Sequence, residues 1–517
     1  MGKVTPCSWI QIRVGEAGIC ITGNTPSTKD PSNYGGNVPY IKPPQLNNQI
    51  VSVGDETLSD KGAQLARILP KNSILVSCIG NLGRAALNTV PAAFNQQINA
   101  IIPSGEIFPK FLFYQVQSSE FRKQLEEIST ATTISIVNKR NFEKIKINLA
   151  PFDEQKRIVA KIEELFSELD SGIAALKTAR EKLKLYRQAV LKHAFEGKLT
   201  AQWREENKDK LETPEQLLAR IQKEREARYQ QQLEEWKAAV KVWEENGKEG
   251  KKPSKPRLSK QDLLLSQSEC SDLPDLPDGY VYTYLANLGD LGRGKSKHRP
   301  RNDPRLFDGK YPFIQTGDVK AANRQICTYT QTYSEFGLRQ SKLWPKGTLC
   351  ITIAANIAET AFLGFDGCFP DSVVGFSSYG SVLPEYVELF IKAVRVHIEA
   401  YAPSTAQKNI NLKTLENLVI PYCSIYEQVK IVDRLNYIFS ITDKNEIEIE
   451  QALTRAKTLR QSILKKAFSG QLVPQDPSDE PASELLARIQ AEKAAQQASA
   501  KGKKTAAKRG RKAKVPS

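Results

Sequence analysis

The strongest constraint on the fold is an internal repeat, because a chain that contains one long unit twice must fold as two similar bodies. The stretch LKHAFEGKL at residues 191–199 recurs as LKKAFSGQL at residues 464–472, which is 273 residues later. Other matches keep the same order in both copies. They pair residues 38–41 with 311–314, 129–131 with 404–406, and 217–222 with 485–490. This pattern indicates tandem duplication of one long unit and argues against a solenoid of short repeats.

Each copy opens with short β-type runs that are broken by Gly, Pro and Asn turns. Residues 73–77 and 348–352 are examples of such runs, and helical patterns lie near residues 109–127 and 384–401. The sequence therefore predicts an α+β globular domain at residues 1–152 and a second one at residues 273–423.

A long amphipathic helix follows each domain, at residues 153–199 and 424–472, with apolar residues at spacings of three, four and seven. A capping box at Ser424–Glu427 marks the start of the second helix. Gly197 and Gly470 mark the ends of the first and second helices. A helix from Glu154 to Phe195 would span ~60 Å. We expect the two helices to pair antiparallel, and the alternative is that each packs on its own domain. The seam residues are Ile158, Ile162, Leu165, Leu169, Ile173, Leu176, Leu183 and Val190 in the first helix and Ile431, Leu435, Ile438, Thr442, Ile449, Leu459 and Ile463 in the second.

Charge points to a polyanionic partner, since the net charge is +16 and the pI is near 9.3. Half of this excess lies at residues 501–514, and we expect residues 473–517 to form a basic, disordered segment. Residues 200–272 are expected to be a charged helical insertion that ends in a flexible basic linker. The basic tail residues are Lys501, Lys503, Lys504, Lys508, Arg509, Arg511, Lys512 and Lys514.

The sequence also limits which cellular compartment and which metal sites we expect for this protein. The cysteines are scattered without a C-x-x-C pair, and with 3 histidines zinc-ligand spacing is absent. No stretch is long and apolar enough to span a membrane, and no secretory signal opens the chain. We therefore expect a soluble, cytoplasmic protein without a metal.

Two stretches imitate enzyme motifs. Gly289–Ser296 matches the Walker A pattern, but Pro300 and Pro304 follow where a P-loop needs a helix. Asn37–Tyr40 is similar to the Asn-Pro-Pro-Tyr motif of adenine methyltransferases, yet no glycine-rich cofactor loop accompanies it. Neither motif has its structural context, and we expect no catalytic site and no cofactor in this chain.

Several features in fixed order resemble the specificity subunit of type I restriction–modification enzymes. They are the junctions Pro151–Gln155 and Ser424–Gln428, the repeated ending Leu-Lys-x-Ala-Phe-x-Gly-x-Leu of the long helices, the loop Gly23–Pro26, and the aromatic openings Trp9 and Tyr280. The resemblance covers nearly the whole chain except residues 223–272 and the tail.

This resemblance implies two tandem α+β target-recognition domains, joined by two long antiparallel coiled-coil helices in a pseudo-twofold arrangement. Each domain would read one half of a bipartite double-stranded DNA site, and the helices would fix the gap between the halves. The implied partners are two copies of an adenine-N6 methyltransferase subunit and a motor–nuclease restriction subunit. S-adenosylmethionine and ATP would then be bound by those partners. The alternative is a coiled-coil scaffold that binds proteins and carries an incidental positive charge.

Candidate DNA-binding residues are amide, hydroxyl and basic side chains in loops at repeat-equivalent places, because such groups suit base edges and phosphates. In the first domain they are Thr25, Ser27, Lys29, Lys42, Gln45, Asn81, Arg84, Gln96, Gln97, Thr132 and Thr133. In the second domain they are Lys295, Lys297, Arg299, Arg301, Gln315, Thr316, Lys320, Asn356, Gln407, Lys408 and Asn409.

Overall fold

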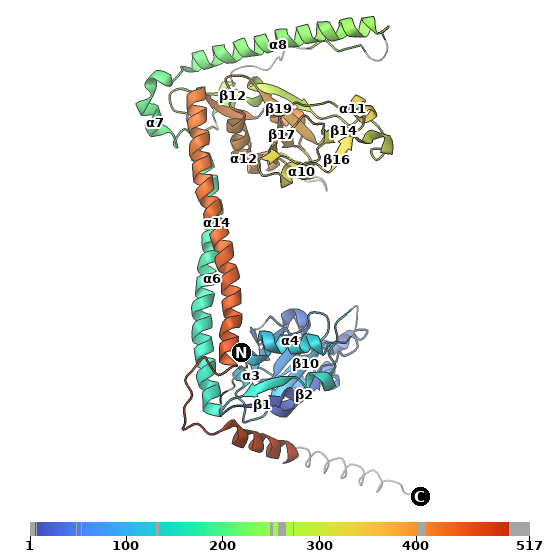
Figure 1. Ribbon diagram of the computed structural model, residues 1–517, viewed down its shortest axis with the longest axis vertical. Helices are drawn as coiled ribbons and strands as arrows, with labels where there is room; N and C mark the ends of the chain where they lie inside the picture. Colours follow the sequence, from blue (N-terminus) through green and yellow to red (C-terminus); the bar gives the residue numbers. More distant parts are fainter. Residues whose placement is uncertain are drawn as a thin grey trace. The chain divides into compact units, whose positions relative to one another are not determined.

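The computed structural model describes residues 6, 8–47, 49–52, 54–130, 134–248, 252–256, 265–271, 273–400 and 410–495. The chain divides into two compact units, whose ribbons are drawn in Figure 1. Unit 1 contains Met1–Thr178 and Ile449–Ser517, and unit 2 contains Ala179–Glu448. Each unit therefore combines one globular domain with stretches of both long helices.

Unit 1 is built around a five-stranded sheet whose central strands are buried on both faces. All four residues of β7 and all four of β8 are buried, as expected for strands that are covered on two sides. Ile74 and Val76 belong to one apolar cluster, whereas Leu75 and Ala86 belong to another. The strand order is β2 (Gly18–Thr22), β10 (Ile98–Pro103), β7 (Ile74–Ser77), β8 (Ala85–Asn88) and β4 (Gln49–Val51).

A second sheet and a short ribbon complete the strands of unit 1. In the ribbon, β1 pairs antiparallel with β11 and so holds the start of the domain against its end. The four-stranded sheet has the order β5 (Glu56–Leu58), β3 (Tyr34–Ile41), β9 (Ala92–Phe94) and β6 (Ile68–Leu69), and the ribbon strands are β1 (Ile10–Arg13) and β11 (Lys146–Leu149). The helices of this domain are α1 (Val14–Ala17), α2 (Asp60–Leu65), α3 (Pro109–Val116), α4 (Ser119–Glu127) and α5 (Lys139–Phe142).

Unit 2 repeats this strand order. Its outer pair β15–β18 is parallel, as is the corresponding pair β4–β8 in unit 1. The five-stranded sheet has the order β13 (Gly289–Arg293), β19 (Val373–Ser378), β17 (Leu349–Thr352), β18 (Thr360–Leu363) and β15 (Gln325–Ile326). The two ribbons are β14 (Phe307–Phe313) with β16 (Gln331–Tyr333), and β12 (Tyr280–Tyr284) with β20 (Val419–Cys423). The predicted pair of similar α+β domains is thus confirmed.

Among the described residues of unit 2, seven helices are assigned besides the two long ones. The predicted helical pattern near residues 384–401 is confirmed by α12, as that near 109–127 is by α3 and α4. The helices are α7 (Ala201–Glu206), α8 (Pro214–Glu245), α9 (Gln267–Cys270), α10 (Thr316–Ala321), α11 (Glu335–Arg339), α12 (Pro384–Ala400) and α13 (Leu412–Glu416).

The predicted long helices are α6 (Phe152–Phe195) and α14 (Ile425–Ala467), of 44 and 43 residues. Both are followed by a glycine at positive φ, Gly197 at 69° and Gly470 at 73°, as the sequence indicated. The serine half of the capping box is confirmed, since the Glu427 backbone N–H donates to Ser424 Oγ at 3.4 Å. The Glu427 side chain instead turns into the core of unit 2.

The two long helices run antiparallel within each unit. In unit 1, Asp170 of α6 forms an ion pair with Arg460 of α14. In unit 2, Arg187 of α6 forms an ion pair with Asp443 of α14. Within unit 1, Ile158 near the start of α6 shares an apolar cluster with Leu464 near the end of α14, whereas Leu176, farther along α6, lines a cavity with Ala452, earlier in α14. Within unit 2, Arg187 pairs with Asp443, and Leu199, which follows α6, accepts a hydrogen bond from Arg434, earlier in α14. The expected antiparallel pairing is therefore confirmed.

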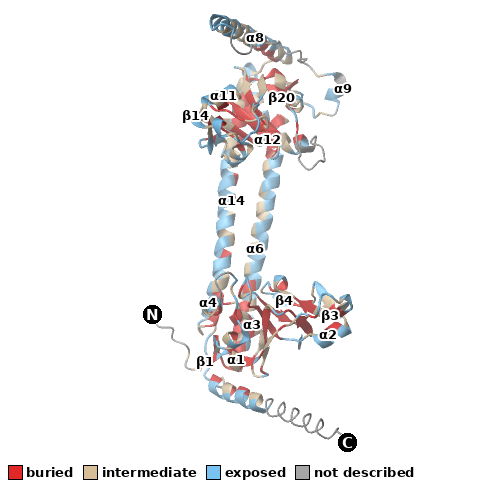
Figure 2. Cartoon of the chain, turned by 90° about the vertical axis from the view of Figure 1, so that its right-hand side faces the viewer, coloured by how far each residue is buried: buried red, intermediate tan, exposed pale blue. Residues whose placement is uncertain are grey.

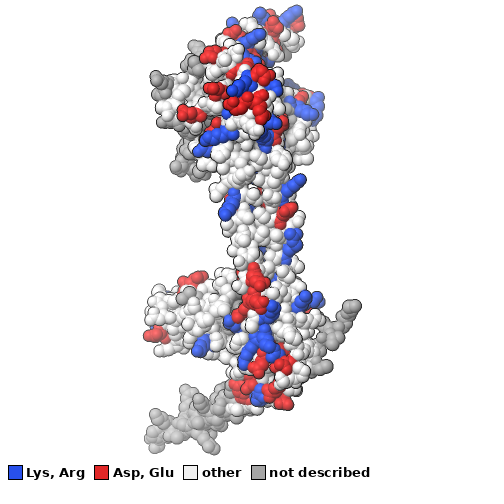
Figure 3. Space-filling model, turned by 90° about the vertical axis from the view of Figure 1, so that its left-hand side faces the viewer, with Lys and Arg blue, Asp and Glu red and all other residues white. Residues whose placement is uncertain are grey.

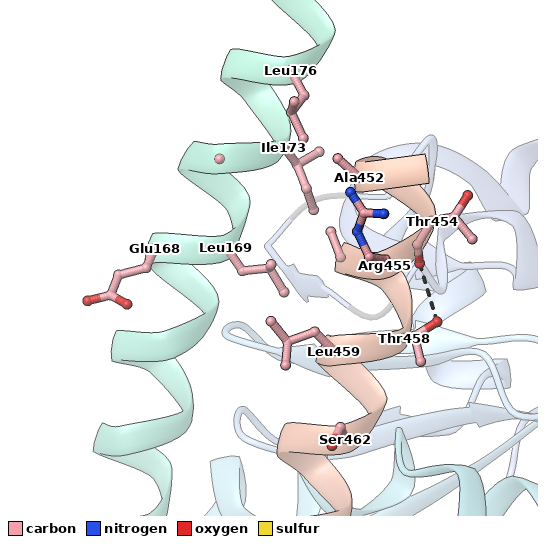
Figure 4. A pocket seen from close by; sticks show the side chains of 12 residues that line it. Glu168, Leu169, Ile173, Leu176, Ala452, Thr454, Arg455, Thr458, Leu459 and Ser462 are labelled. Carbon is pink, nitrogen blue, oxygen red and sulfur yellow. Dashed lines mark hydrogen bonds between the residues drawn. The ribbon is translucent and has the colours of Figure 1, made fainter. Parts of the chain in front are cut away.

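The predicted seam closes unevenly. Ile158 and Ile162 are fully buried, whereas Leu459 lies on the predicted seam but is 51% exposed. Figure 2 shows buried residues concentrated in the sheets while long stretches of both helices are exposed. In unit 1 an apolar cavity of about 710 Å³ opens between α6 and α14, where Leu169 of α6 and Leu459 of α14 face each other (Figure 4). Small residues such as Gly172 and Ala452 line this cavity and leave it open.

The segment that follows each long helix packs on the domain of the other repeat. After α6, Leu217 and Ile221 of α8 are buried in the core of unit 2. After α14, Leu485 and Ile489 are buried in the core of unit 1. These four residues belong to the two copies of the stretch LLARIQ, so the repeat extends to this contact as well.

This contact corrects the expectation of a disordered tail from residue 473 onward. Residues 482–495 form a helix, and Ala482, Leu485 and Ile489 are fully buried. The average composition of the tail hid a short run of apolar residues at helical spacing, which can be buried against a neighbouring surface. Residues 496–517, with all eight basic residues named above, lie outside the described residues.

Candidate nucleic-acid interface

Polar loops of unit 1 meet at one end of the five-stranded sheet because the strand register brings the ends of the strands together. Thr22 at the end of β2 pairs with Asn99, and Ser77 at the end of β7 pairs with Ile98. Three connections leave from this end: the loop after β2, the β7–β8 turn and the β9–β10 turn. We call this end of unit 1, together with residues 129–130 and 134–137, polar edge 1.

Backbone hydrogen bonds fix these loops against one another. The Cys78 N–H donates to the carbonyl of Gln97 at 2.8 Å, and the Val137 N–H donates to the carbonyl of Cys78 at 2.8 Å. The Gly80 N–H donates to the carbonyl of Ser135 at 3.0 Å. Loops tied in this way present their side chains from a rigid scaffold.

Unit 2 has the same arrangement, which we call polar edge 2. The Ile353 N–H donates to the carbonyl of Ser372 at 2.9 Å, and the Ile410 N–H donates to the carbonyl of Ile353 at 3.0 Å. These two bonds correspond one for one to those of Cys78 and Val137. The two copies have thus diverged in sequence while they kept the same loop geometry.

The loop after the first strand of each sheet depends on a glycine. A Cβ on Gly23 would lie 2.1 Å from the carbonyl oxygen of Asn95, and a Cβ on Gly294 would lie 2.3 Å from that of Pro370. No other residue fits such a close backbone approach. The glycine places Thr25 beside two other side chains of polar edge 1, and Thr25 Oγ1 forms hydrogen bonds with Gln96 and, at 2.6 Å, with the hydroxyl of Tyr40.

The β7–β8 turn and its counterpart also share a strained backbone. Gly80 and Gly83 have φ of 75° and 78°, and their counterparts Ala355 and Ala358 have φ of 64° and 56°. An alanine in this left-handed region costs roughly 1 kcal/mol or more. Both turns carry an asparagine between the two strained positions, Asn81 in one copy and Asn356 in the other.

A side-chain pair spans the strands that flank each polar edge. In unit 1, Lys42 Nζ donates to Glu56 Oε1 at 2.5 Å. In unit 2, Gln315 Nε2 donates to Gln331 Oε1 at 2.5 Å. The strand partners are equivalent, because Glu56 stands opposite Tyr40 in the β3–β5 ladder and Gln331 stands opposite Phe313 in the β14–β16 ladder. An ion pair in one copy is therefore replaced by an amide pair in the other.

Polar edge 2 surrounds a cavity of about 540 Å³. The rings of Phe313 and Tyr333, which help to line it, are stacked with centroids 4.0 Å apart. Burial raises the pKa of Tyr333, as it raises that of Tyr40 in unit 1. Both phenols are therefore neutral hydrogen-bonding groups at physiological pH. The polar residues around this cavity include Ser296, Arg301, Gln315, Thr316 and Gln331.

The charges at the two edges are mixed. The salt bridge with Lys61 holds the pKa of Asp30 down, at about 2, and the bonds from Arg305 likewise lower the pKa of Asp303. On the face drawn in Figure 3, Lys and Arg side chains alternate with Asp and Glu side chains instead of forming one continuous basic surface. At the edges themselves, Asp30 and Asp303 offset part of the positive charge of Lys61 and Arg305.

Most of the predicted site residues lie at these edges. On the surface of unit 1, exposed or partly exposed, are Thr25, Ser27, Lys29, Lys42, Asn81, Arg84, Gln96 and Gln97. The corresponding residues of unit 2 are Lys295, Lys297, Arg299, Arg301, Gln315, Thr316, Lys320 and Asn356. Four of the unit 2 residues have side-chain partners, since Arg301 pairs with Asp371, Gln315 donates to Gln331, and Lys320 donates to Asn356 Oδ1 at 3.1 Å.

Gln45 differs from this pattern. It is buried, and its Oε1 accepts a hydrogen bond from the Lys42 backbone N–H at 2.9 Å, so its side chain supports the turn after β3 and does not face outward. Thr132, Thr133, Gln407, Lys408 and Asn409 lie outside the described residues.

Sequence reasoning missed Glu56 and Gln331. Each is an isolated polar residue in a short strand, and nothing local distinguishes it from an ordinary surface residue. The signal that could have found them is the repeat itself, which aligns Glu56 with Gln331 just as it aligns Lys42 with Gln315.

The motifs that imitate enzymes fold as strands and loops. Gly289–Arg293 forms β13, and the Lys295 backbone N–H donates to the carbonyl of Phe369 at 3.1 Å. Asn37–Tyr40 lies within β3. Among the described residues, no cluster of three or more His, Cys, Asp or Glu side chains could hold a metal ion. No helix of the described chain is long and apolar enough to cross a membrane.

Comparison with known proteins gives consistent matches over both units. Residues 7–178 and 285–455 match the family model described as type I restriction modification DNA specificity domain. The specificity subunit of the type I restriction enzyme EcoKI from Escherichia coli strain K12 is 24% identical over 515 residues, which cover 96% of this chain and 97% of that protein. The specificity subunit of HindI from Haemophilus influenzae is 33% identical over 171 residues, which cover 31% of this chain and 37% of that protein.

Two solved structures share the fold. A chain from a structure on complex assembly and conformational transition of the type I R-M system has a TM-score of 0.64 at 18% identity and covers 90% of this chain and 99% of that one. The HsdS subunit from Thermoanaerobacter tengcongensis has a TM-score of 0.52 at 17% identity, with coverage of 90% and 98%.

Proposed function

The chain belongs to the type I restriction modification DNA specificity family and supplies DNA sequence specificity in a restriction–modification complex, and from this premise we propose that it reads one double-stranded site in two halves. Each half would be read by one globular domain. The observation that carries the proposal is the repeated polar edge, on which the same backbone presents different side chains. A monomer with two such readers imitates a dimeric DNA-binding protein. Because the side chains differ, the two half-sites differ in sequence.

The chain acts with DNA and with other subunits of the system. We propose that these subunits are two copies of an adenine-N6 methyltransferase and a motor–nuclease restriction subunit. S-adenosylmethionine and ATP are then bound by those subunits, and this chain is a recognition component without catalysis of its own. The strand-and-loop structure of the stretch that imitates a P-loop supports this division of labour, because a P-loop needs a helix N-terminus at that point.

We propose that α6 and α14 together set the gap between the half-sites. Deletion of residues 173–179 and 446–452 removes one heptad from each helix and shortens the pair by about 10 Å. Because seven residues are removed from each helix between the ion pairs Asp170–Arg460 and Arg187–Asp443, the members of both pairs stay opposite each other. We expect both half-sites to keep their sequences while the gap shrinks by about three base pairs. An unchanged gap in DNA modified by the shortened protein would rule out this role of the helices.

The test of the central proposal is selection from a random duplex DNA pool with this chain and its methyltransferase subunit, at moderate salt. Two short, different motifs at one constant separation are expected. Salt-sensitive binding without an enriched sequence would contradict the proposal and would leave a basic protein-binding scaffold as the function. The salt concentration must be held fixed, because phosphate contacts alone give strongly salt-dependent affinity.

A further inference from the structure

We infer that the side-chain pair at each polar edge reads one base pair of its half-site, a G·C pair at the Lys42–Glu56 position and an A·T pair at the Gln315–Gln331 position. The inference rests on the proposed function and adds the chemical identity of one base pair to each half. It starts from the finding that these two pairs occupy the same place in the two units.

The equivalence of the two places is set by the backbone. Lys42 follows directly after β3, which ends at Ile41, and Gln315 comes two residues after the end of β14 at Phe313. The opposite members of the pairs, Glu56 and Gln331, both open their short strands. Both side-chain bridges measure 2.5 Å. A difference in what the two pairs recognise therefore comes from their chemistry, since their placement is shared.

Both pairs are accessible. The side chains of Lys42 and Glu56 are 39% and 47% exposed, and Gln315 and Gln331 are also exposed. A pair that only tied two strands together would need no exposure, and the strands are already held by their own backbone ladders. The exposed atoms are free to meet another molecule.

The amide pair presents one donor and one acceptor side by side. Gln315 Nε2 donates to Gln331 Oε1, so the Gln331 amide keeps its NH₂ and the second lone pair of its Oε1, on one planar group, without another side-chain partner among the described residues. In the major groove an adenine offers N7 as an acceptor and N6–H₂ as a donor. A free NH₂ next to a free carbonyl lone pair complements these two groups, which is the reason that Asn and Gln read adenine.

The ion pair presents a different pattern. The Lys42 ammonium keeps two N–H donors after it bonds to Glu56, and the second carboxylate oxygen of Glu56 is an acceptor without a hydrogen atom. Lysine suits the O6 and N7 acceptors of guanine, and a carboxylate suits the N4–H₂ donor of cytosine. The pair thus matches the two bases of one G·C pair. A carboxylate next to adenine N7 or thymine O4 would place one acceptor against another, which is unfavourable.

The strained turns do not carry this difference at their asparagine. The strained turns keep an asparagine in both copies, as Asn81 and Asn356, and also keep a hydroxyl that bonds the carbonyl of that asparagine, from Ser77 or Thr352. A group that is the same in both copies can contact what both half-sites share. At the Lys42–Glu56 and Gln315–Gln331 pairs an equivalent side-chain bridge carries different chemistry in the two copies, and this is the difference to which we assign the choice of base pair.

The experiment exchanges the two pairs within the full complex. Lys42→Gln with Glu56→Gln gives domain 1 the amide pair, and Gln315→Lys with Gln331→Glu gives domain 2 the ion pair. Each complex of variant chain and methyltransferase modifies random-sequence plasmid DNA, and the modified adenines are mapped by sequencing. We expect the first variant to change one G·C position of one half-site to A·T, with a preference change of about 10-fold to 100-fold, and to leave the other half-site unaltered.

A matched control is available in the same unit. Lys110 and Glu163 form an ion pair of 2.7 Å with side chains that are 35% and 38% exposed, but they lie on α3 and α6 and not at the polar edge. Lys110→Gln with Glu163→Gln should leave the motif unchanged. A motif that also stays unchanged in the Lys42 and Glu56 variant, with modification intact, overturns the inference.

Single substitutions keep the inference testable if the exchanged pairs impair modification. Lys42→Ala and Gln331→Ala should each relax specificity at one position of opposite half-sites in the pool selection. Relaxation at no position, or at several positions of both half-sites, contradicts the inference. These outcomes leave the two-part motif of the unaltered protein in place, whereas failure of the proposed function would abolish that motif itself.

Discussion

Glu154 and Glu427 occupy equivalent places in the two units, and their partners differ. In unit 1, Glu154 accepts hydrogen bonds from Trp9 Nε1 at 2.9 Å and from the amide of Gln475. Burial raises the pKa of this carboxyl, and the two bonds act in the opposite direction. Its partners are neutral, and the nearby Arg157 pairs with Asp479 instead.

In unit 2 the same position carries a full charge pair. Glu427 accepts hydrogen bonds from the Tyr280 hydroxyl at 2.7 Å and from Thr200 at 2.6 Å, and it forms an ion pair with Arg204 at 2.6 Å. Its side chain is fully buried and that of Arg204 is 11% exposed. One glutamate thus joins the first strand of the domain to the segment that follows the long helix from the other repeat.

The comparison shows what duplication preserved. The buried acceptor, the aromatic donor from the first strand and the contribution from the other repeat are common to both units. The partner from the other repeat is neutral in unit 1, where it is Gln475, and charged in unit 2, where it is Arg204. Backbone geometry was retained while side-chain chemistry changed, and the same is true of the polar edges, where we propose that the change alters specificity.

The largest expected effect is the loss of the buried ion pair in unit 2. Glu427→Ala leaves the Arg204 guanidinium uncompensated, and we expect the free energy of unfolding of unit 2 to fall by about 3–5 kcal/mol. Glu154→Ala removes an acceptor from neutral donors and should cost unit 1 about 1–3 kcal/mol. Hydrogen exchange followed peptide by peptide measures each unit separately.

A double-mutant cycle sharpens this prediction. Arg204→Met in the Glu427→Ala background should restore part of the stability, because no buried charge is then left alone. Equal losses in the two units, or no recovery in the double variant, would show that the charge of Arg204 is not the source of the difference.

The next effect concerns the helices that complete each domain. Leu485→Ala should destabilise unit 1 and Leu217→Ala should destabilise unit 2, each by about 3 kcal/mol, because each leucine is fully buried in the core of that unit. Hydrogen exchange is the measurement, since the protection of the other unit should be retained. Leu185→Ala is the control, because Leu185 is 71% exposed and its loss should cost less than about 0.5 kcal/mol. Equal loss of protection in both units from Leu485→Ala would falsify the assignment of this helix to unit 1.

The smallest effect has opposite signs in the two units. Gly80→Ala should destabilise unit 1 by about 1 kcal/mol, because it places a Cβ in the left-handed region, although nothing lies within 4 Å of that Cβ. Ala355→Gly should stabilise unit 2 by up to about 1 kcal/mol, because it relieves the strain of the left-handed backbone, part of which is offset by the greater freedom of glycine in the unfolded chain. Urea unfolding curves of the variants measure both changes. A loss of stability in Ala355→Gly would mean that the alanine methyl group contributes more than its backbone strain costs.

Much of this architecture could be predicted from the sequence because it rests on local patterns. The long helices followed from apolar spacing, and their ends followed from Gly197 and Gly470. The polar edges were predicted as a group, since polar residues in turns between buried strands must lie at the ends of those strands. The exposure of Leu459 on the seam and the burial of Gln45 did not follow from the sequence, because periodicity and polarity indicate a face but not how closely another part of the chain covers it.

The sequence alone determined that the protein is one α+β unit with a long helix, made twice, with polar loops at matching places. Only the tertiary structure decided which segments complete which domain, as in the salt bridge between Arg157 and Asp479, which are 322 residues apart. It also decided that Lys42 meets Glu56 where Gln315 meets Gln331. The physical reason is that burial of apolar surface has no direction, so a pattern specifies that a residue is buried or exposed. The identity of its partner is settled only when distant parts of the chain compete for the same surface.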